Sequence, residues 1–150
     1  TRTARNKTPR MYDDDSVKNL RIGKGSVLRE GSDIAIIACG VMVHKAVIAA
    51  NNLSEEGIDV CVVDMHTIKP LDTNLIDKIS TTCRGIVTVE DHSVIGGLGS
   101  SISEYLSGSN PTKITRMGVE DRFGESGGSE ELLDLVGLTV ERIEDACRNL

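Results

Sequence analysis

The sequence predicts an α/β fold: a three-layer, open and mostly parallel sheet of about five strands with helices on both faces. Apolar runs of strand length alternate along the chain with segments that have helical periodicity, and the connections between them are short. This alternation is typical of βαβ crossovers in an open sheet. The chain has 150 residues, of which 39% are hydrophobic and 27% charged. A domain of this size buries enough surface to fold without disulfides.

The first predicted strand covers residues 33–39 (DIAIIAC), an uninterrupted apolar run typical of a strand buried on both faces. Gly40 interrupts the run. Apolar residues at helical spacing then predict an amphipathic helix over 41–56, which we expect to end at Gly57. Residues 58–64 (IDVCVVD) form the second predicted buried strand.

Pro70 delays the next helix, and Asp72 is its expected N-cap. Residues 85–89 (GIVTV) predict a third strand, and the helix that follows covers 96–106. Residues 112–117 (TKITRM) predict a fourth strand.

A glycine-rich loop at 124–128 precedes two short predicted helices, near 129–136 and 139–149. Val27 and Leu28 are expected to add one strand at an edge of the sheet. The sequence shows no internal repeat. Ligands of such folds bind beyond the carboxyl ends of the strands, so the candidate positions are the strand ends near residues 39, 64, 90 and 117.

Composition excludes several functional classes. The formal net charge is −6, which argues against nucleic acid as a partner. The chain has two Tyr, one Phe and no Trp, too few aromatic residues for a base-stacking surface. No apolar run approaches the ~20 residues of a membrane span. Cys39 and Cys61 lie inside apolar runs without a CxxC pair, so we expect buried thiols in a reducing, cytoplasmic environment.

Residues 1–20 differ from the remainder and are predicted to be an arm or linker, with the domain itself covering 21–150. The arm is polar, first basic and then acidic, and it does not begin with Met, so we expect the chain to be part of a longer protein. Its basic residues are Arg2, Arg5, Lys7 and Arg10. Arginine side chains suit phosphate or carboxylate ligands, and a solvated basic tail is the alternative.

The segment Glu90-Asp91-His92 follows the third predicted strand. Two carboxylates beside an imidazole could perform acid–base chemistry, because each group tunes the pKa of the other. The alternative is that these side chains cap the next helix, hold its loop or lie at an interface. No nucleophile with a matching motif accompanies them, which favours the structural role.

Gly96, Gly97 and Gly99 open the next predicted helix. Bare N–H groups at a helix start favour anions, so a phosphate could bind there. The dinucleotide fingerprint GxGxxG is incomplete, because Ile102 stands where its last glycine should be. The alternative is that the small residues let the helix approach the sheet closely. The later glycine-rich loop has no Lys, and we expect a flexible connection with Ser129 as an N-cap.

Four ordered segments resemble the C-terminal domain of transketolases. They are GKGSVLREGSDIAIIACGVMVHKAVIAA, VVDMHTIKPLD, GIVTVEDHSVIGGLGSSISEYL and DRFGESGGSEELLDLVGLT, which together span most of the chain from Ile22 onward. The arm is similar to the end of the pyrimidine-binding domain that precedes this domain in the family. The 1-deoxyxylulose-5-phosphate synthases and the beta subunits of 2-oxoacid dehydrogenases share the fold. The segments Thr3–Arg5, Val89–His92 and Phe123–Gly127 are more similar to transketolase.

The resemblance implies a parent enzyme that transfers a two-carbon ketol unit between sugar phosphates with thiamine diphosphate and Mg²⁺. In the family that cofactor lies between two other domains at a homodimer interface, so none is expected bound to this chain. The glutamate that activates the cofactor belongs to the pyrimidine domain and is not Glu90. We therefore predict no catalytic and no metal-binding residue here, and a role in dimer and domain packing. The polar strand end and the glycine-rich helix start are expected to lie at a subunit or domain interface, with these candidate residues: Glu90, Asp91, His92, Gly96, Gly97 and Gly99.

One functional residue carries over from the family. An arginine near the end of the pyrimidine domain contacts the substrate phosphate, and the alignment of Ala4-Arg5-Asn6 with Pro9 places this role on Arg5, with Arg2 as the alternative. The predicted partners are the preceding domains or subunit and a second copy in a homodimer. A different class of function, a free-standing nucleotide- or effector-binding module of the same fold, is the remaining alternative.

Overall fold

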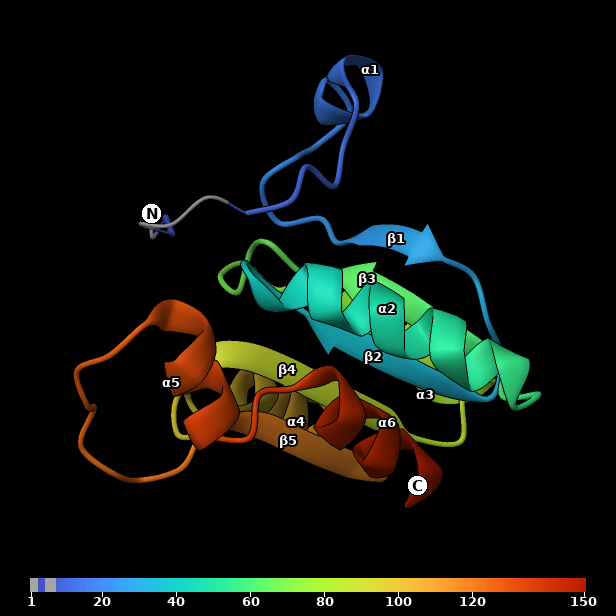
Figure 1. The fold of residues 1–150 in the computed structure, drawn as a ribbon. Helices are drawn as coiled ribbons and strands as arrows, with labels where there is room; N and C mark the ends of the chain where they lie inside the picture. Colours follow the sequence, from blue (N-terminus) through green and yellow to red (C-terminus); the bar gives the residue numbers. More distant parts are fainter. Residues whose placement is uncertain (1–2, 5–7) are drawn as a thin grey trace.

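The computed structural model describes residues 3–4 and 8–150 of the chain. Its five strands form one sheet in the order β1-β3-β2-β4-β5 (Figure 1). The strands are β1 (Ser26–Arg29), β2 (Ile34–Ala38), β3 (Val60–Asp64), β4 (Ile86–Ser93) and β5 (Ile114–Val119). The helices are α1 (Asp14–Val17), α2 (Met42–Glu55), α3 (Thr73–Thr82), α4 (Leu98–Gly108), α5 (Ser129–Leu135) and α6 (Val140–Arg148).

The sheet is parallel except at one edge, where β1 runs antiparallel to β3. Strand β2 lies at the centre, with Ile36 opposite Val62 on one side and Val87 on the other. All five residues of β2 and of β3 are buried. The predicted fold class is confirmed, because continuous apolar runs have become strands that are covered on both faces.

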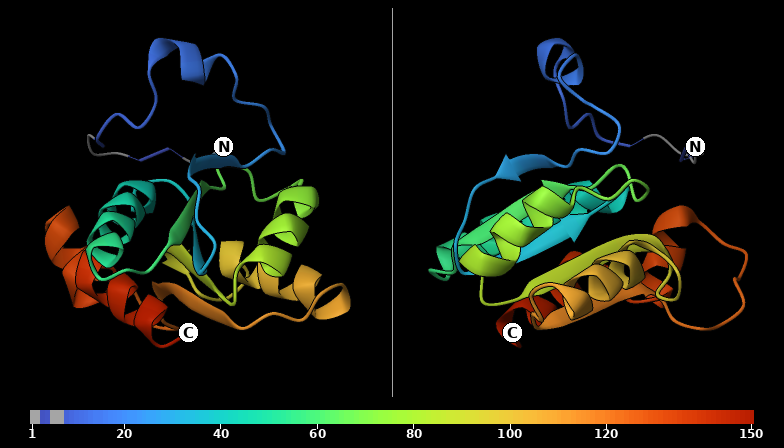
Figure 2. Two further views of the ribbon diagram at one scale, coloured as in Figure 1. Left: turned by 90° about the vertical axis from the view of Figure 1, so that its right-hand side faces the viewer. Right: turned by 180° about the vertical axis from the view of Figure 1, so that it is seen from behind.

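Two separate apolar clusters cover the two faces of the sheet. Helices α2 and α6 lie on one face, and α3 and α4 lie on the other (Figure 2). Residues that alternate along β2 point into different clusters: Ile36 belongs to the first and Ile37 to the second. Both faces of the sheet are therefore covered by helices of this chain.

The order of the strands reverses at β2. The chain passes from β2 through α2 to β3 on one side, then through α3 to β4 on the other side of β2. Loops after β2 and β4 therefore lead to opposite faces, which is where ligands bind in open α/β sheets. These carboxyl ends position the candidate site.

The arm contains more structure than its sequence predicts. Residues Asp14–Val17 form α1, whose N-cap Asp13 accepts a hydrogen bond from the Ser16 N–H at 2.7 Å. Met11 packs against the first apolar cluster, and the Tyr12 hydroxyl reaches β3. Polar residues without periodicity gave no helical signal, because one short turn depends on its cap and on the anchoring of its neighbours.

Three local expectations were wrong. Strand β4 continues to Ser93, beyond the predicted end at residue 89, with a register shift against β5 between Val89 and Ser93. Cys39 is only partly buried, because it follows the last residue of β2. The residue that precedes α5 is Gly128, so Ser129 is the first residue of the helix and not its N-cap.

Candidate functional site

The candidate site lies where β4 leads into α4. Glu90 is 2% exposed, and its carboxylate accepts hydrogen bonds from the backbone N–H groups of Leu98 at 2.8 Å and Gly99 at 2.9 Å. These N–H groups belong to the first turn of α4, which has no partner for them within the helix. The positive end of the helix dipole also favours the negative charge of Glu90.

The two glycines at the start of α4 allow this contact. A Cβ atom at Gly97 would lie 2.1 Å from the Glu90 Oε2 atom. A Cβ atom at Gly99 would lie 2.5 Å from Thr88 Oγ1 and 3.0 Å from the Arg116 side chain. A side chain at either position would force these neighbouring atoms to shift. The interpretation of these glycines as close-approach residues is therefore confirmed.

The phosphate alternative for this helix start is wrong. The Glu90 carboxylate occupies the position that an anion would take, and it uses the N–H groups of both Leu98 and Gly99. A second anion at this position would meet a buried carboxylate. At the carboxyl end of β4, the chain's own Glu90 side chain thus occupies the position where a ligand would bind.

His92 is held apart from Glu90. Its Nδ1 atom donates to the Ser93 carbonyl oxygen at 2.9 Å and lies 3.8 Å from Glu90 Oε2, beyond hydrogen-bonding distance. The Glu90 oxygens are directed at backbone donors, and the His92 side chain is 47% exposed. No hydrogen bond therefore joins the two groups of the acid–base pair that the sequence made conceivable.

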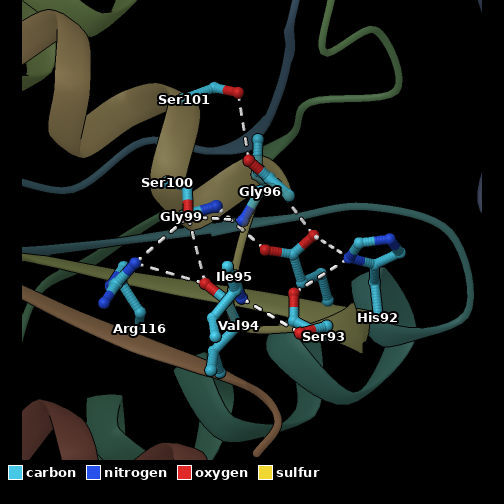
Figure 3. A network of polar contacts seen from close by, with 12 residues as sticks. His92, Ser93, Val94, Ile95, Gly96, Gly99, Ser100, Ser101 and Arg116 are labelled. Atoms are coloured by element: carbon cyan, nitrogen blue, oxygen red, sulfur yellow. Dashed lines mark hydrogen bonds and ion pairs between the residues drawn. The ribbon is translucent and has the colours of Figure 1, made fainter. Parts of the chain in front are cut away.

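The loop between β4 and α4 is fastened at several points, as Figure 3 shows. The Ser100 hydroxyl donates to the Val94 carbonyl at 3.1 Å and accepts from the Gly96 N–H at 2.9 Å. The Arg116 guanidinium, on β5, donates to the same carbonyl at 3.2 Å and to the Ser100 hydroxyl at 3.1 Å. These contacts tie the loop to the start of α4 and to β5.

The six predicted interface residues separate into two groups. Glu90, Gly97 and Gly99 are buried within the chain, and they shape the loop from beneath. His92 and Gly96 are exposed and Asp91 is partly exposed, with Ile95 60% exposed beside them. Only the second group can contact another polypeptide directly. The other predicted residues, Arg2 and Arg5, lie outside the residues that the structure describes.

Asp64, at the carboxyl end of β3, is a polar residue whose role the sequence did not reveal. It is 8% exposed, and Tyr12 of the arm donates a hydrogen bond to its Oδ2 atom at 2.7 Å. Its Oδ1 atom is buried without a partner among the described residues. Burial raises the pKa of Asp64, although the Tyr12 hydrogen bond opposes this effect. Burial likewise raises the pKa of Tyr12.

The Tyr12–Asp64 contact joins residues 52 positions apart, so periodicity could not predict it. Thr88 was missed for a similar reason. Its hydroxyl is buried beneath Gly99 without a partner among the described residues. In the sequence, Thr88 is a β-branched residue within an apolar strand, and nothing there distinguishes it from its neighbours.

The described residues do not fit a metal or a diphosphate group. Among residues 3–4 and 8–150, no three His, Cys, Asp or Glu side chains are grouped so that they could hold a metal ion. The start of α4, the natural position for a diphosphate, is occupied by Glu90. In the same part of the chain, no helix has the length and apolar character needed to cross a bilayer.

The fold and the site define a doubly wound α/β domain whose β4 edge is closed by its own carboxylate. Residues 23–143 match the family model described as transketolase, C-terminal domain. The chain therefore belongs to the transketolase C-terminal domain family, as the sequence resemblance indicated.

Individual relatives agree with this family. The chain is 39% identical over 142 residues to a 6-deoxy-6-sulfo-D-fructose transketolase subunit of Clostridium sp., covering 95% of this chain and 44% of that protein. It is 41% identical over 143 residues to a putative transketolase C-terminal section of Methanocaldococcus jannaschii, with the same shares covered. A 1-deoxy-D-xylulose-5-phosphate synthase of Carboxydothermus hydrogenoformans is 39% identical over 127 residues, which cover 84% of this chain and 20% of the enzyme.

Among solved structures, a split gene transketolase described as an inactive beta4 tetramer superposes with a TM-score of 0.91. It is 41% identical and covers 97% of this chain and 47% of that chain. The chain thus spans less than half the length of these relatives.

Proposed function

We propose that this chain is the non-catalytic C-terminal domain of a thiamine-diphosphate-dependent transketolase, whose intact enzyme transfers a two-carbon ketol unit between sugar phosphates. The observation that carries the proposal is the 41% identity to a split gene transketolase over 97% of this chain. The intact enzyme would hold thiamine diphosphate and Mg²⁺ with residues outside this chain.

The domain would act through packing and assembly, with the preceding domains or subunit and a second copy as partners. In support, the polar groups at the end of β4 are directed inward: Glu90 binds the start of α4, and Ser100 and Arg116 fasten the loop above it. The polar side chains therefore stabilise the β4–α4 loop, and His92, Ile95 and Gly96 remain exposed on its outer surface. We place the interface at this loop.

The synthase relatives support a second candidate, a C-terminal domain of a 1-deoxyxylulose-5-phosphate synthase, since they are up to 43% identical over 85% of this chain. A free-standing nucleotide-binding module is disfavoured, because Glu90 occupies the helix start that would bind a phosphate.

The test uses the intact parent enzyme with thiamine diphosphate and Mg²⁺. Ketol transfer between sugar phosphates supports the proposal, whereas release of 1-deoxyxylulose 5-phosphate without ketol transfer supports the synthase. Turnover by this chain alone would contradict a non-catalytic role. In the parent, His92→Ala is expected to weaken assembly while the rate per assembled enzyme changes little; a lost rate with unchanged assembly would revive an acid–base role for His92.

A further inference from the structure

Residues 12–26, the arm loop, begin and end at the carboxyl end of β3. At the first end, the Tyr12 hydroxyl donates to Asp64 Oδ2 at 2.7 Å. At the second end, Ser26 opens β1 and pairs with the same Asp64 in the register between β1 and β3. Between these ends α1 stands away from the sheet and buries no residue (Figures 1 and 2). A loop whose ends meet in this way is a defined element and not a free linker.

A second carboxylate holds the arm loop shortly before it enters β1. Asp72 is buried and accepts a hydrogen bond from the Gly25 N–H at 3.1 Å. Its Oδ1 atom also lies 3.3 Å from Lys24 Nζ. Asp64 and Asp72 flank residues 65–71, the β3–α3 connection. The arm loop is therefore held at both of its ends by the carboxylates on either side of this connection.

The contact between Tyr12 and Asp64 differs from an exposed polar contact. Asp64 is 8% exposed, and its Oδ1 atom is buried without a hydrogen-bond partner among the described residues. Loss of the Tyr12 hydroxyl would therefore leave both oxygens of a buried carboxylate without a donor in that part of the chain. An unsatisfied buried charge costs more than one hydrogen bond contributes. Water can satisfy it only by entering between the arm and the sheet, so the loss favours opening of the arm loop.

The arm loop and the β3–α3 connection also expose apolar side chains. Val17 and Ile22 are exposed on the arm loop, and Ile68 is exposed on the connection. The connection lies at the same edge of the sheet as the β4–α4 loop, because β3 and β4 flank β2 and all three strands run parallel. One partner at the carboxyl edge of the sheet can therefore contact both segments.

We propose that Tyr12 and Asp64 are positioning residues that hold the arm loop on the β3–α3 connection, so that the preceding part of the enzyme joins this domain over the carboxyl end of β3. The proposal deepens the proposed function and rests on it, because the partner is the preceding part of a transketolase. The chain covers 44% of two curated relatives, so more than half of such a protein is available as that partner.

The first test follows tryptic cleavage of the arm loop in the native, intact parent enzyme. Mass spectrometry reports cleavage after Lys18 and Arg21, which are exposed and lie within the loop. A native segment has to open before a protease can cleave it, so the rate reports the population of the open arm loop. Tyr12→Phe should raise this rate at least about tenfold, which corresponds to the loss of one hydrogen bond to a charged group.

Two further variants make this test specific. Tyr105→Phe is the matched control, because the Tyr105 hydroxyl donates to Asp77 Oδ2 at 2.8 Å in the same kind of bond between α4 and α3. It should leave cleavage of the arm loop unchanged. Asp64→Ala removes the buried carboxylate, so in that background Tyr12→Phe should change the rate less than about twofold. An unchanged rate in Tyr12→Phe, or an equally large effect with and without Asp64, would overturn the proposal.

A second measurement locates the partner. Hydrogen exchange of residues 65–71 is compared between the intact parent and this chain alone, whose sheet is covered on both faces by its own helices. Exchange should be at least about tenfold slower in the parent, and Tyr12→Phe should reduce that difference. Equal exchange in the two proteins would contradict the placement of the preceding part at this edge.

Neither measurement depends on ketol transfer, so the two proposals fail separately. A parent that shows both effects but transfers no ketol group would refute the proposed function and leave the positioning role standing. A parent that transfers ketol groups while Tyr12→Phe leaves cleavage unchanged would refute the positioning role alone.

Discussion

Replacing Glu90 by alanine tests whether this carboxylate holds α4 against the sheet. The change leaves the buried N–H groups of Leu98 and Gly99 without their acceptor. Each hydrogen bond to a charged group contributes about 1.5–3 kcal/mol. Release of the carboxylate from its buried position offsets part of the loss. We therefore expect the free energy of unfolding to fall by about 2–5 kcal/mol, a large share of the stability of one domain.

Urea unfolding followed by circular dichroism measures this loss, with an unchanged denaturant slope as evidence that both states stay comparable. Glu90→Gln keeps one acceptor oxygen but turns its amide hydrogens toward the other N–H group, so it should lose about 1–3 kcal/mol. Glu104→Ala, an exposed change on the same helix, is the matched control and should stay within about 0.5 kcal/mol of the original chain.

Acetate provides a second, independent readout, because it replaces the missing carboxylate. At tenfold excess over its dissociation constant it should restore about 1.4 kcal/mol to Glu90→Ala, and nothing to the original chain, whose donors are already occupied. Sodium chloride of equal ionic strength is the control. A Glu90→Ala chain within about 1 kcal/mol of the original, or equal effects of acetate on both chains, would refute the reasoning.

Three further predictions concern the core, the buried Asp64 and the parent enzyme. Ile36→Ala, in the central strand, should cost about 2–5 kcal/mol in urea unfolding, and an unchanged midpoint would contradict its full burial. Burial raises the pKa of Asp64 in the fold, so the folded chain holds its proton at a pH where the unfolded chain has lost it. Stability linked to this group is complete below the unfolded pKa and is lost as the pH rises through the folded pKa. Asp64→Asn should remove that decline, which begins near the unfolded pKa of about 4, and unfolding measurements over a range of pH check this; an identical pH profile would exclude the effect. In the intact parent, Arg5→Ala should raise KM for a phosphorylated donor about tenfold or more and leave a non-phosphorylated ketose nearly unaffected; equal losses on both would mean a structural role, and a loss in Arg2→Ala alone would move the assignment to Arg2.

The sequence was sufficient for the sheet and for most of its helices, because local patterns carry that information. Uninterrupted apolar runs identified β2 and β3, and apolar residues at helical spacing identified α2. The Asp72 cap was also predictable, and its side chain accepts from the Leu75 N–H at 3.4 Å. Strand ends were less certain, since the extension of β4 to Ser93 depends on pairing with β5 and not on any local pattern.

The candidate site was located by sequence, but its chemistry was not decided there. The sequence favoured a structural role for Glu90, His92 and the glycines at the start of α4, but it left an acid–base pair and an anion site open as alternatives. Which of these roles applies depends on where the Glu90 carboxylate points. It bonds the start of α4, and it can approach because Gly97 has no side chain.

Contacts between distant segments needed the folded chain. Tyr12 meets Asp64 across 52 residues. The spacing of apolar residues predicts which side of a helix or strand is apolar, because side chains return to the same face every few residues along one backbone segment. It says nothing about which distant side chain completes a hydrogen bond, since that depends on how the helices pack against the sheet.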